Sequence, residues 1–164
     1  MLRAYIKEDV KALQDLFHET LTRSNCRDYS PDQLAVWAKG AALESHWHER
    51  LSIGMTVLAV NETDYPQGFG TLTKDGVIDF LFVHPDCQRK GIGLLILGEL
   101  ENQARILGLL SLESAVSITA KKFFKSNGYQ VLAKQKVYRE GIELENFRMK
   151  KYYLSNKKLT LQRV

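Results

Sequence analysis

The segment Gln88-Arg89-Lys90-Gly91-Ile92-Gly93 constrains this chain more than any other part of its sequence. It follows a strand-like apolar run that ends at Val83-His84-Pro85, and it precedes a helix-like run from Leu94. Glycines allow close approach of the backbone to a ligand, and a helix N-terminus adds unpaired N–H groups and partial positive charge. Each charge-assisted hydrogen bond there contributes about 1.5–3 kcal/mol, and the helix dipole about 0.3–1 kcal/mol more. The segment therefore predicts a cradle for a pyrophosphate.

The spacing of the glycines does not fit two common phosphate-binding motifs. A kinase or ATPase P-loop requires Gly-x-x-x-x-Gly-Lys followed by Ser or Thr, whereas Lys90 precedes Gly91 here. A Rossmann fingerprint requires a third Gly or Ala where this chain has Ile96, and Glu113 fills its acidic position only loosely. A glycine-rich connector that binds no ligand is a third interpretation.

Length and composition indicate one domain of enzyme size. With 164 residues, 45% of them hydrophobic, the chain can bury a core without metals or disulfides. Cys26 and Cys87 form neither a disulfide framework nor a CxxC metal pair, which favours a reducing, cytoplasmic location. The N-terminus lacks a signal-peptide pattern, and the longest apolar stretch, 92–97, is too short to span a bilayer. We therefore expect no membrane partner and no metal.

The net charge of +4 arises at the C-terminal end of the chain. Residues 150–164 hold five basic groups and no acidic ones, which leaves 18 basic against 19 acidic groups over residues 1–149. Nucleic-acid binding would require a basic face interleaved with aromatic residues across the fold. We therefore expect no nucleic-acid partner, a domain over 1–152 and a solvated basic tail over 153–164.

Hydrophobic periodicity predicts strands and helices that alternate along the chain. Ser30 and Pro31 with Gln33 form a capping-box signature at the start of one helix, and Asp75-Gly76 marks a hairpin turn. The expected strands cover 2–6, 55–60, 68–73, 77–83, 109–113, 129–138 and 144–152, and the expected helices cover 7–21, 31–40, 43–51, 91–107 and 119–126.

The helix over 91–107 has an amphipathic pattern. Glu101 and Arg105 form an i,i+4 pair that we place on its exposed side. The expected buried stripe consists of Leu94, Leu97, Leu100, Ala104 and Leu107.

Two motifs and the order of elements resemble the GNAT superfamily of acetyl-CoA-dependent N-acyltransferases. The strand–loop–helix unit around Gln88-x-x-Gly91-x-Gly93 is similar to the coenzyme A loop of that family. Ser117-x-x-Ala120, followed by an aromatic residue and Gly128-Tyr129, looks like its second signature. The resemblance covers about residues 2–150. It implies an α/β (α+β) protein with a mixed, mostly antiparallel twisted sheet of about seven strands flanked by helices.

Two further segments narrow the resemblance. Asp28-Tyr29-Ser30-Pro31 with Trp37, together with Gly141 to Met149, resembles the YafP-like branch of predicted acetyltransferases.

The resemblance implies that acetyl-CoA is the co-substrate. In the family, the strand before the loop pairs its main chain with the pantetheine arm, and the loop faces the pyrophosphate. For the apolar positions, plain core packing is an equally good interpretation. The expected cofactor-binding residues are Leu81, Phe82, Val83, Gln88, Arg89, Lys90, Gly91, Ile92, Gly93, Leu94, Ser117 and Phe124.

Acetyl transfer to an amine requires removal of a proton. An amine with a pKa near 10.4 is neutral in about one molecule in 2,500 at pH 7, a penalty of roughly 4.6 kcal/mol. Asp79, four residues before Val83, is the catalytic base that the resemblance implies, and Glu113 is the competing candidate. A solvated strand aspartate is the alternative interpretation of Asp79.

The leaving thiolate is where the chain departs from the family pattern. Many members carry a Tyr four residues after the motif Ala, and here that position is Phe124. Because a thiol of pKa about 8.5 leaves easily, an acid is helpful but not obligatory. Tyr129, Tyr138 or water are possible substitutes.

The acceptor is expected to lie against aromatic residues of the N-terminal half, namely Tyr29, Trp37 and Trp47. Helix packing explains Trp37 equally well. We expect transfer of the acetyl group to a primary amine of a small molecule by direct attack on the thioester. A protein or peptide acetyltransferase and a non-catalytic CoA-binding sensor are the alternatives. Pairing of the last strand and the basic tail with a second subunit, to form a homodimer, is a further alternative.

Overall fold

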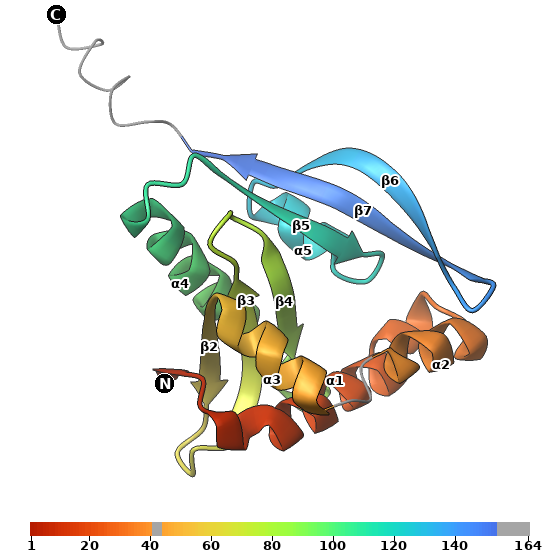
Figure 1. The fold of residues 1–164 in the computed structure, drawn as a ribbon, viewed down its shortest axis with the longest axis horizontal. Helices are drawn as coiled ribbons and strands as arrows, with labels where there is room; N and C mark the ends of the chain where they lie inside the picture. The colour runs from red at the N-terminus through yellow and green to blue at the C-terminus, as the bar shows by residue number, and fades with distance from the viewer. Residues whose placement is uncertain (41–43, 154–164) are drawn as a thin grey trace, which may run out of the picture.

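Seven strands form two sheets that join along one short stretch of backbone (Figure 1). The computed structural model describes residues 1–40 and 44–153. The strands are β1 (Leu2–Ala4), β2 (Met55–Val60), β3 (Pro66–Leu72), β4 (Ile78–Val83), β5 (Ser111–Ser117), β6 (Gln130–Arg139) and β7 (Ile142–Tyr152). The helices are α1 (Val10–Arg23), α2 (Pro31–Lys39), α3 (Glu44–Ile53), α4 (Ile92–Ile106) and α5 (Lys121–Ser126), with 3-10 turns η1 (Lys7–Asp9), η2 (Asn25–Arg27) and η3 (Pro85–Cys87).

The two sheets have strand orders β1-β2-β3-β4 and β5-β7-β6, and the pairings within each sheet are antiparallel. A parallel bridge between Val77 and Glu113 joins them, and Ser114 Oγ donates a hydrogen bond to Ile78 O at 2.8 Å beside it. Beyond this junction β4 and β5 diverge, as Figure 1 shows. The predicted α+β fold with seven mostly antiparallel strands is confirmed, and the split between β4 and β5 leaves a gap between the two sheets.

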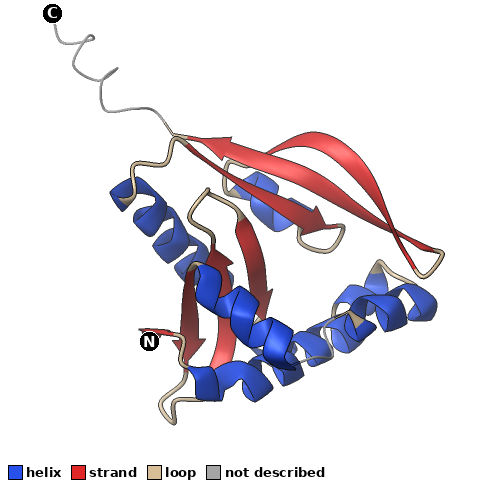
Figure 2. Cartoon of the chain, in the orientation of Figure 1, coloured by secondary structure: helices blue, strands red, loops and turns tan. Residues whose placement is uncertain are grey.

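Helices cover both faces of the first sheet (Figure 2). Successive side chains of a strand point to opposite faces, so β2 can be apolar throughout. Val57 and Ala59 pack in the core under α4, whereas Leu58 and Val60 pack in a second core under α1 and α3. Burial on both faces holds β4, the strand at the edge of the gap, in a rigid frame.

A close contact between α4 and β3 depends on Gly70. A Cβ atom at this position would lie 2.7 Å from Ile96 Cγ2 and 2.9 Å from Leu100 Cδ1. Side chains do not approach a Cβ atom so closely, and any residue larger than glycine would push the helix outward. Gly70 therefore sets the height of α4 over the sheet, and with it the position of the loop at the N-terminus of the helix.

The predicted buried stripe of α4 was partly wrong. Leu94 and Leu107 are 56% and 58% exposed, whereas Ile96 is fully buried. Glu101 is only 7% exposed, although we placed it on the outer side. Its carboxylate accepts hydrogen bonds from Lys151 Nζ at 2.8 Å and from the Tyr129 hydroxyl at 3.2 Å. A charge on the inner face is tolerated because β7 and the start of β6 bring these partners to it.

The start of α2 follows the sequence prediction. The hydroxyl of Ser30 accepts a hydrogen bond from the Gln33 backbone at 3.2 Å, and Gln33 Oε1 accepts one from Ser30 N–H at 2.8 Å. The capping box is therefore confirmed. Leu43, expected to begin the next helix, lies outside the described residues, as does the predicted basic tail after Tyr153.

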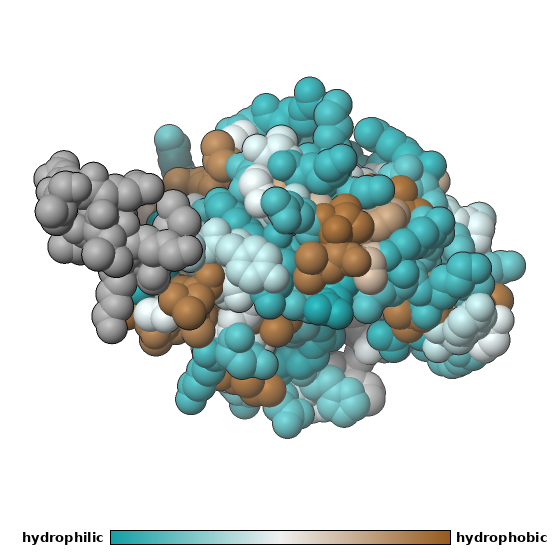
Figure 3. All heavy atoms as spheres, turned by 90° about the horizontal axis from the view of Figure 1, so that it is seen from above, coloured by the Kyte–Doolittle hydropathy of each residue, from teal (hydrophilic) through white to brown (hydrophobic). Residues whose placement is uncertain are grey.

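The surface is mainly hydrophilic on the side that Figure 3 shows, with small separate hydrophobic patches. Over residues 1–40 and 44–153, the helices are all too short or too polar to cross a bilayer. Exposed apolar groups of this scattered kind are ordinary on a protein surface.

Candidate active site

The glycine loop forms an open concavity at the N-terminus of α4. Arg89 and Gly91 both have left-handed backbone conformations, with φ of 62° and 81°. Gly91 caps the helix without any side-chain hydrogen bond to the first-turn N–H groups. A Cβ atom at Gly91 would meet no atom within 4 Å, so the space in front of it is open. Unpaired N–H groups, a helix dipole and free space are what an anion such as a pyrophosphate requires.

Side chains from α1 and from the loop itself hold this segment in place. Gln88 Nε2 donates hydrogen bonds to Ser24 Oγ at 2.9 Å and to Val83 O at 3.1 Å. Arg23 forms ion pairs with Asp86 and with Glu19. The side chain of Gln88, expected at the cofactor, thus braces the loop against β4 and α1.

The backbone of β4 is open toward the gap. His84 N–H donates to Gln67 O at 2.9 Å, and antiparallel pairs alternate along a strand. Phe82, which faces Phe69, therefore pairs with β3, whereas Leu81 and Val83 direct their N–H and C=O groups into the gap. Val83 O is already used by Gln88, which leaves the backbone of Leu81 as the free pairing site at the centre of the strand.

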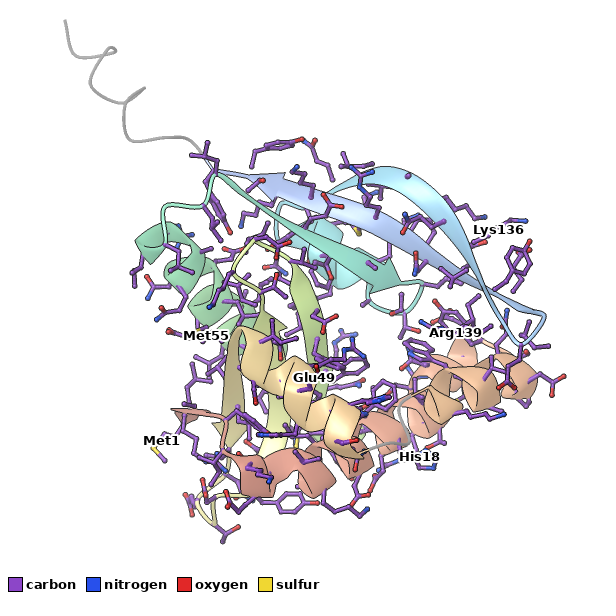
Figure 4. The ribbon with its side chains drawn as sticks, in the orientation of Figure 1. Met1, His18, Glu49, Met55, Lys136 and Arg139 are labelled. Carbon is purple, nitrogen blue, oxygen red and sulfur yellow. The ribbon has the colours of Figure 1, made fainter. Side chains whose placement is uncertain are left out.

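A pocket of about 310 Å³ lies in the gap between β4 and β5. Residues of α1, α2, α3 and the hairpin of β6 and β7 close it (Figure 4). Its walls include seven of the residues expected from the sequence: Tyr29, Trp37, Asp79, Leu81, Phe82, Ser117 and Phe124. Val83 and the loop Gln88 to Leu94 lie beyond this pocket, at the end of the gap where α4 begins.

Asp79 is presented to the pocket by a β-bulge. Thr71 pairs with Phe80 and Leu72 pairs with Ile78, so Asp79 is the extra residue on β4. Its carboxylate accepts hydrogen bonds from Arg50 Nη2 at 2.8 Å and from Arg50 Nε at 3.1 Å. The guanidinium of Arg50 in turn lies 4.2 Å from the centroid of the Phe80 ring.

Sequence reasoning missed Arg50, which also lines the pocket. Arg50 lies 29 positions from Asp79. The periodicity of hydrophobic residues does not predict a contact between a helix and a distant strand. The one feature of the sequence that could have pointed to Arg50 was its basic side chain on the helix expected over 43–51.

Glu113, the competing base, lies at the junction of the two sheets. Its carboxylate forms ion pairs with Arg148 Nε at 2.7 Å and with Lys150 Nζ at 3.8 Å, and it is not among the residues that line the pocket. Of the two candidate carboxylates, Asp79 is the one that faces the gap.

Phe124 is buried in the wall of the pocket, where the aromatic rings of Phe123 and Tyr129 pack against it edge-on. Burial raises the pKa of Tyr129, and its hydroxyl is bonded to Glu101. The hydroxyl of Tyr138 donates to Glu143 Oε2 at 2.7 Å on the outside of the hairpin. Both tyrosine hydroxyls therefore lie away from the pocket and are poorly placed to protonate a thiolate in it.

The hydroxyl of Tyr29 connects two elements of the pocket wall. Its hydroxyl donates to Glu145 O at 2.6 Å and accepts from Ile118 N–H at 2.9 Å, so it connects β7 with the segment after β5. Burial raises the pKa of Tyr29, which keeps the phenol neutral. The Trp37 ring packs edge-on against Tyr29, with centroids 5.3 Å apart.

The expectation that Trp47 borders the acceptor was wrong. The indole is 2% exposed and stacks on Phe80, with ring centroids 5.1 Å apart, in the core below the pocket. A large apolar ring on the inner face of α3 gains more free energy from burial than from contact with a solvated cleft.

Comparison with known proteins agrees with the motifs and the geometry. Residues 25–151 match the family model described as an acetyltransferase (GNAT) domain. The chain is 32% identical over 149 residues to the uncharacterized N-acetyltransferase YafP of Escherichia coli (strain K12), covering 91% of this chain and 93% of that protein.

Solved structures share the fold. A GCN5-related N-acetyltransferase from Rhodopseudomonas palustris superposes with a TM-score of 0.88 at 32% identity, covering 93% of this chain and 95% of the other. The PaiA N-acetyltransferase of Thermoplasma acidophilum, in complex with coenzyme A, has a TM-score of 0.76 at 18% identity and covers 93% and 98%. The chain therefore belongs to the GNAT family of acetyltransferases, on the branch of YafP, and is an acyltransferase enzyme.

Proposed function

We propose that this enzyme transfers the acetyl group of acetyl-CoA to the primary amine of a small molecule by direct attack on the thioester. One observation carries the proposal. The open backbone of β4 connects the uncapped N-terminus of α4 at one end with the pocket that holds Asp79 at the other. A long cofactor with an anionic head and a reactive tip fits such a continuous gap.

The groups along the gap follow the same order as the parts of acetyl-CoA that they would bind. The first-turn N–H groups of α4, the open space at Gly91 and the exposed Arg89 would hold the pyrophosphate. The backbone of Leu81 would pair with the pantetheine arm. When bound, acetyl-CoA supplies the activated acyl group, and the chain itself supplies orientation and proton transfer.

Asp79 is the group that we assign to proton removal. Each carboxylate oxygen accepts one hydrogen bond from Arg50 and keeps a second lone pair. It can therefore accept a proton from the incoming amine, directly or through water. The fork of Arg50 fixes the orientation of the carboxylate, since a guanidinium matches carboxylate geometry with two donors.

The pocket favours a small acceptor over a protein. Its volume of about 310 Å³ is close to the lower end of typical ligand sites, about 300–1,000 Å³. Trp37 of α2 and Val137 of the β6–β7 hairpin both line the pocket, so these two elements close it. A peptide substrate would instead need a groove that is open at both ends.

A non-catalytic CoA sensor is the second candidate. Phe124 provides no hydroxyl for the leaving thiolate, and Asp79 is already paired with Arg50. Both features would suit a protein that binds the cofactor without turnover.

Two measurements test the proposal. Titration calorimetry should show that acetyl-CoA binds at one site, and no heat of binding would refute the cofactor assignment. Release of the CoA thiol with a panel of primary amines should then exceed hydrolysis without amine. Binding without any amine-dependent release would favour the sensor.

A further inference from the structure

The two carboxylates that line the pocket, Asp79 and Glu145, are each paired with a basic group. Because each carboxylate is neutralised, the pocket holds no free negative charge among the described residues. The pairs are Asp79 with Arg50 and Glu145 with Lys134, both at 2.8 Å, and beside the pocket Glu140 pairs with Lys39 of α2 at 2.7 Å.

Arg139 is the exception among the charged residues that line the pocket. It is the last residue of β6 and it lines the pocket, yet it forms no ion pair or hydrogen bond with another described residue. Its Nη1 atom lies 3.8 Å from the point that a Cβ of Gly40 would occupy, at the C-terminal end of α2. Figure 4 shows Arg139 at the hairpin beside α2, whereas Lys136 of the same strand lies on the outer side.

An unpaired guanidinium in a pocket wall implies a ligand of opposite charge. Arginine presents five N–H donors in a planar fork that matches a carboxylate or another oxyanion. Glu140, the next residue along the hairpin, pairs with Lys39, and Glu145 pairs with Lys134, so neither of these carboxylates occupies the fork of Arg139. A polycationic acceptor would meet one uncompensated positive charge and no free carboxylate.

We infer that the acceptor amine also carries an anionic group, in the simplest case a carboxylate as in an amino acid, and that Arg139 binds this group. The inference rests on the proposed acetyl transfer, because it concerns the same pocket. Trp37 and Tyr29, which line the same pocket, would contact the apolar body of such a molecule. The anionic group would thus lie at the mouth of the pocket and the amine would point toward Asp79.

Binding of reaction products is a sharper test than turnover. A carboxamide in place of the carboxylate lowers the pKa of the neighbouring amine and so alters its reactivity, whereas an N-acetylated compound has no amine to titrate. We would titrate the CoA-saturated enzyme with N-acetyl-L-amino acids of aromatic, aliphatic and polar side chains, and with their carboxamides. The acids should bind about 10- to 100-fold more tightly than the matched carboxamides.

Three variants at two positions of β6 test the guanidinium separately from the rest of the hairpin. Arg139→Gln should abolish the difference between acid and carboxamide, and Arg139→Lys should restore part of it. Lys136→Gln removes one positive charge from the same hairpin outside the pocket, and it should retain the full difference. Unfolding temperatures should stay close to wild type in all three, because each position is on the surface.

The outcomes separate this inference from the proposed function. Equal binding of acids and carboxamides, a ratio unchanged in Arg139→Gln, or no binding of any acid in the panel would overturn the role of Arg139. Release of CoA with amines that carry no anionic group would then leave the acetyl transfer standing. Failure of acetyl-CoA itself to bind would instead overturn the proposed function.

Discussion

The two ends of the gap between β4 and β5 are built in different ways. At the end near α4, the groups that we propose to bind the cofactor are backbone N–H and C=O groups from one stretch of chain, residues 81–94. At the proposed acceptor end they are side chains, and they come from four helices and four strands. Tyr29 and its partner Glu145, for example, are 116 positions apart in the sequence.

The two ends therefore place different requirements on their residues. A backbone site tolerates many side chains but depends on a few conformations, such as the positive φ of Gly91. A side-chain site depends on the chemical identity of each group and on the packing that brings it in. Substitutions at the two ends should therefore change different measured quantities.

The largest effect should follow from Asp79→Asn at the acceptor end. Loss of a general base lowers kcat by about 10²- to 10⁴-fold, because the amine remains protonated. The dissociation constant of acetyl-CoA should stay within about twofold of wild type, since the backbone site is untouched. Glu113→Gln is the matched control, and kinetics with calorimetry should show little change there. A fall in kcat for Glu113→Gln and not for Asp79→Asn would reverse the assignment.

Gly91→Val should affect the cofactor end alone. A β-branched residue is strained at a φ of 81°, so the loop would leave the conformation that presents its N–H groups. We expect the affinity for acetyl-CoA to fall about 100-fold, which equals about 2.7 kcal/mol. Calorimetry measures the loss. Unchanged affinity would remove the loop from the cofactor site.

Tyr29→Phe should reduce stability at the acceptor end. The change leaves Ile118 N–H and Glu145 O without their buried partner, which costs about 1–3 kcal/mol. Urea unfolding should show a lower midpoint, while Tyr65→Phe, at an exposed tyrosine, should leave it unchanged. Acetyl-CoA affinity should be preserved, and a parallel loss of that affinity would mean that the two ends are not independent.

The smallest effect should come from Gly98→Ala on α4. A Cβ at this position meets no atom within 4 Å, and alanine favours a helix interior over glycine by about 0.5–1 kcal/mol. We expect a slightly higher unfolding midpoint and unchanged acetyl-CoA affinity. A decrease in affinity would show that the stiffness of α4, and not only its N-terminus, matters for the cofactor.

Local patterns in the sequence predicted the secondary structure around the glycine loop and the start of α2 well. The strand before the loop, the helix after it and the capping box at Ser30 all depend on residues within a few positions of one another. The prediction failed where a partner came from elsewhere. Glu101 is buried because Lys151 and Tyr129 meet it, and Trp47 is a core residue because Phe80 lies beneath it.

The sequence by itself determined the family, the order of elements and the glycine loop, because backbone conformation and helix caps follow from neighbouring residues. The tertiary structure decided how the acceptor end is composed. It joined Arg50 to Asp79, closed the pocket with the β6–β7 hairpin and left Arg139 without a partner among residues 1–40 and 44–153. Those contacts depend on the bulge at Asp79 and on the divergence of β4 from β5, which periodicity along one chain does not encode.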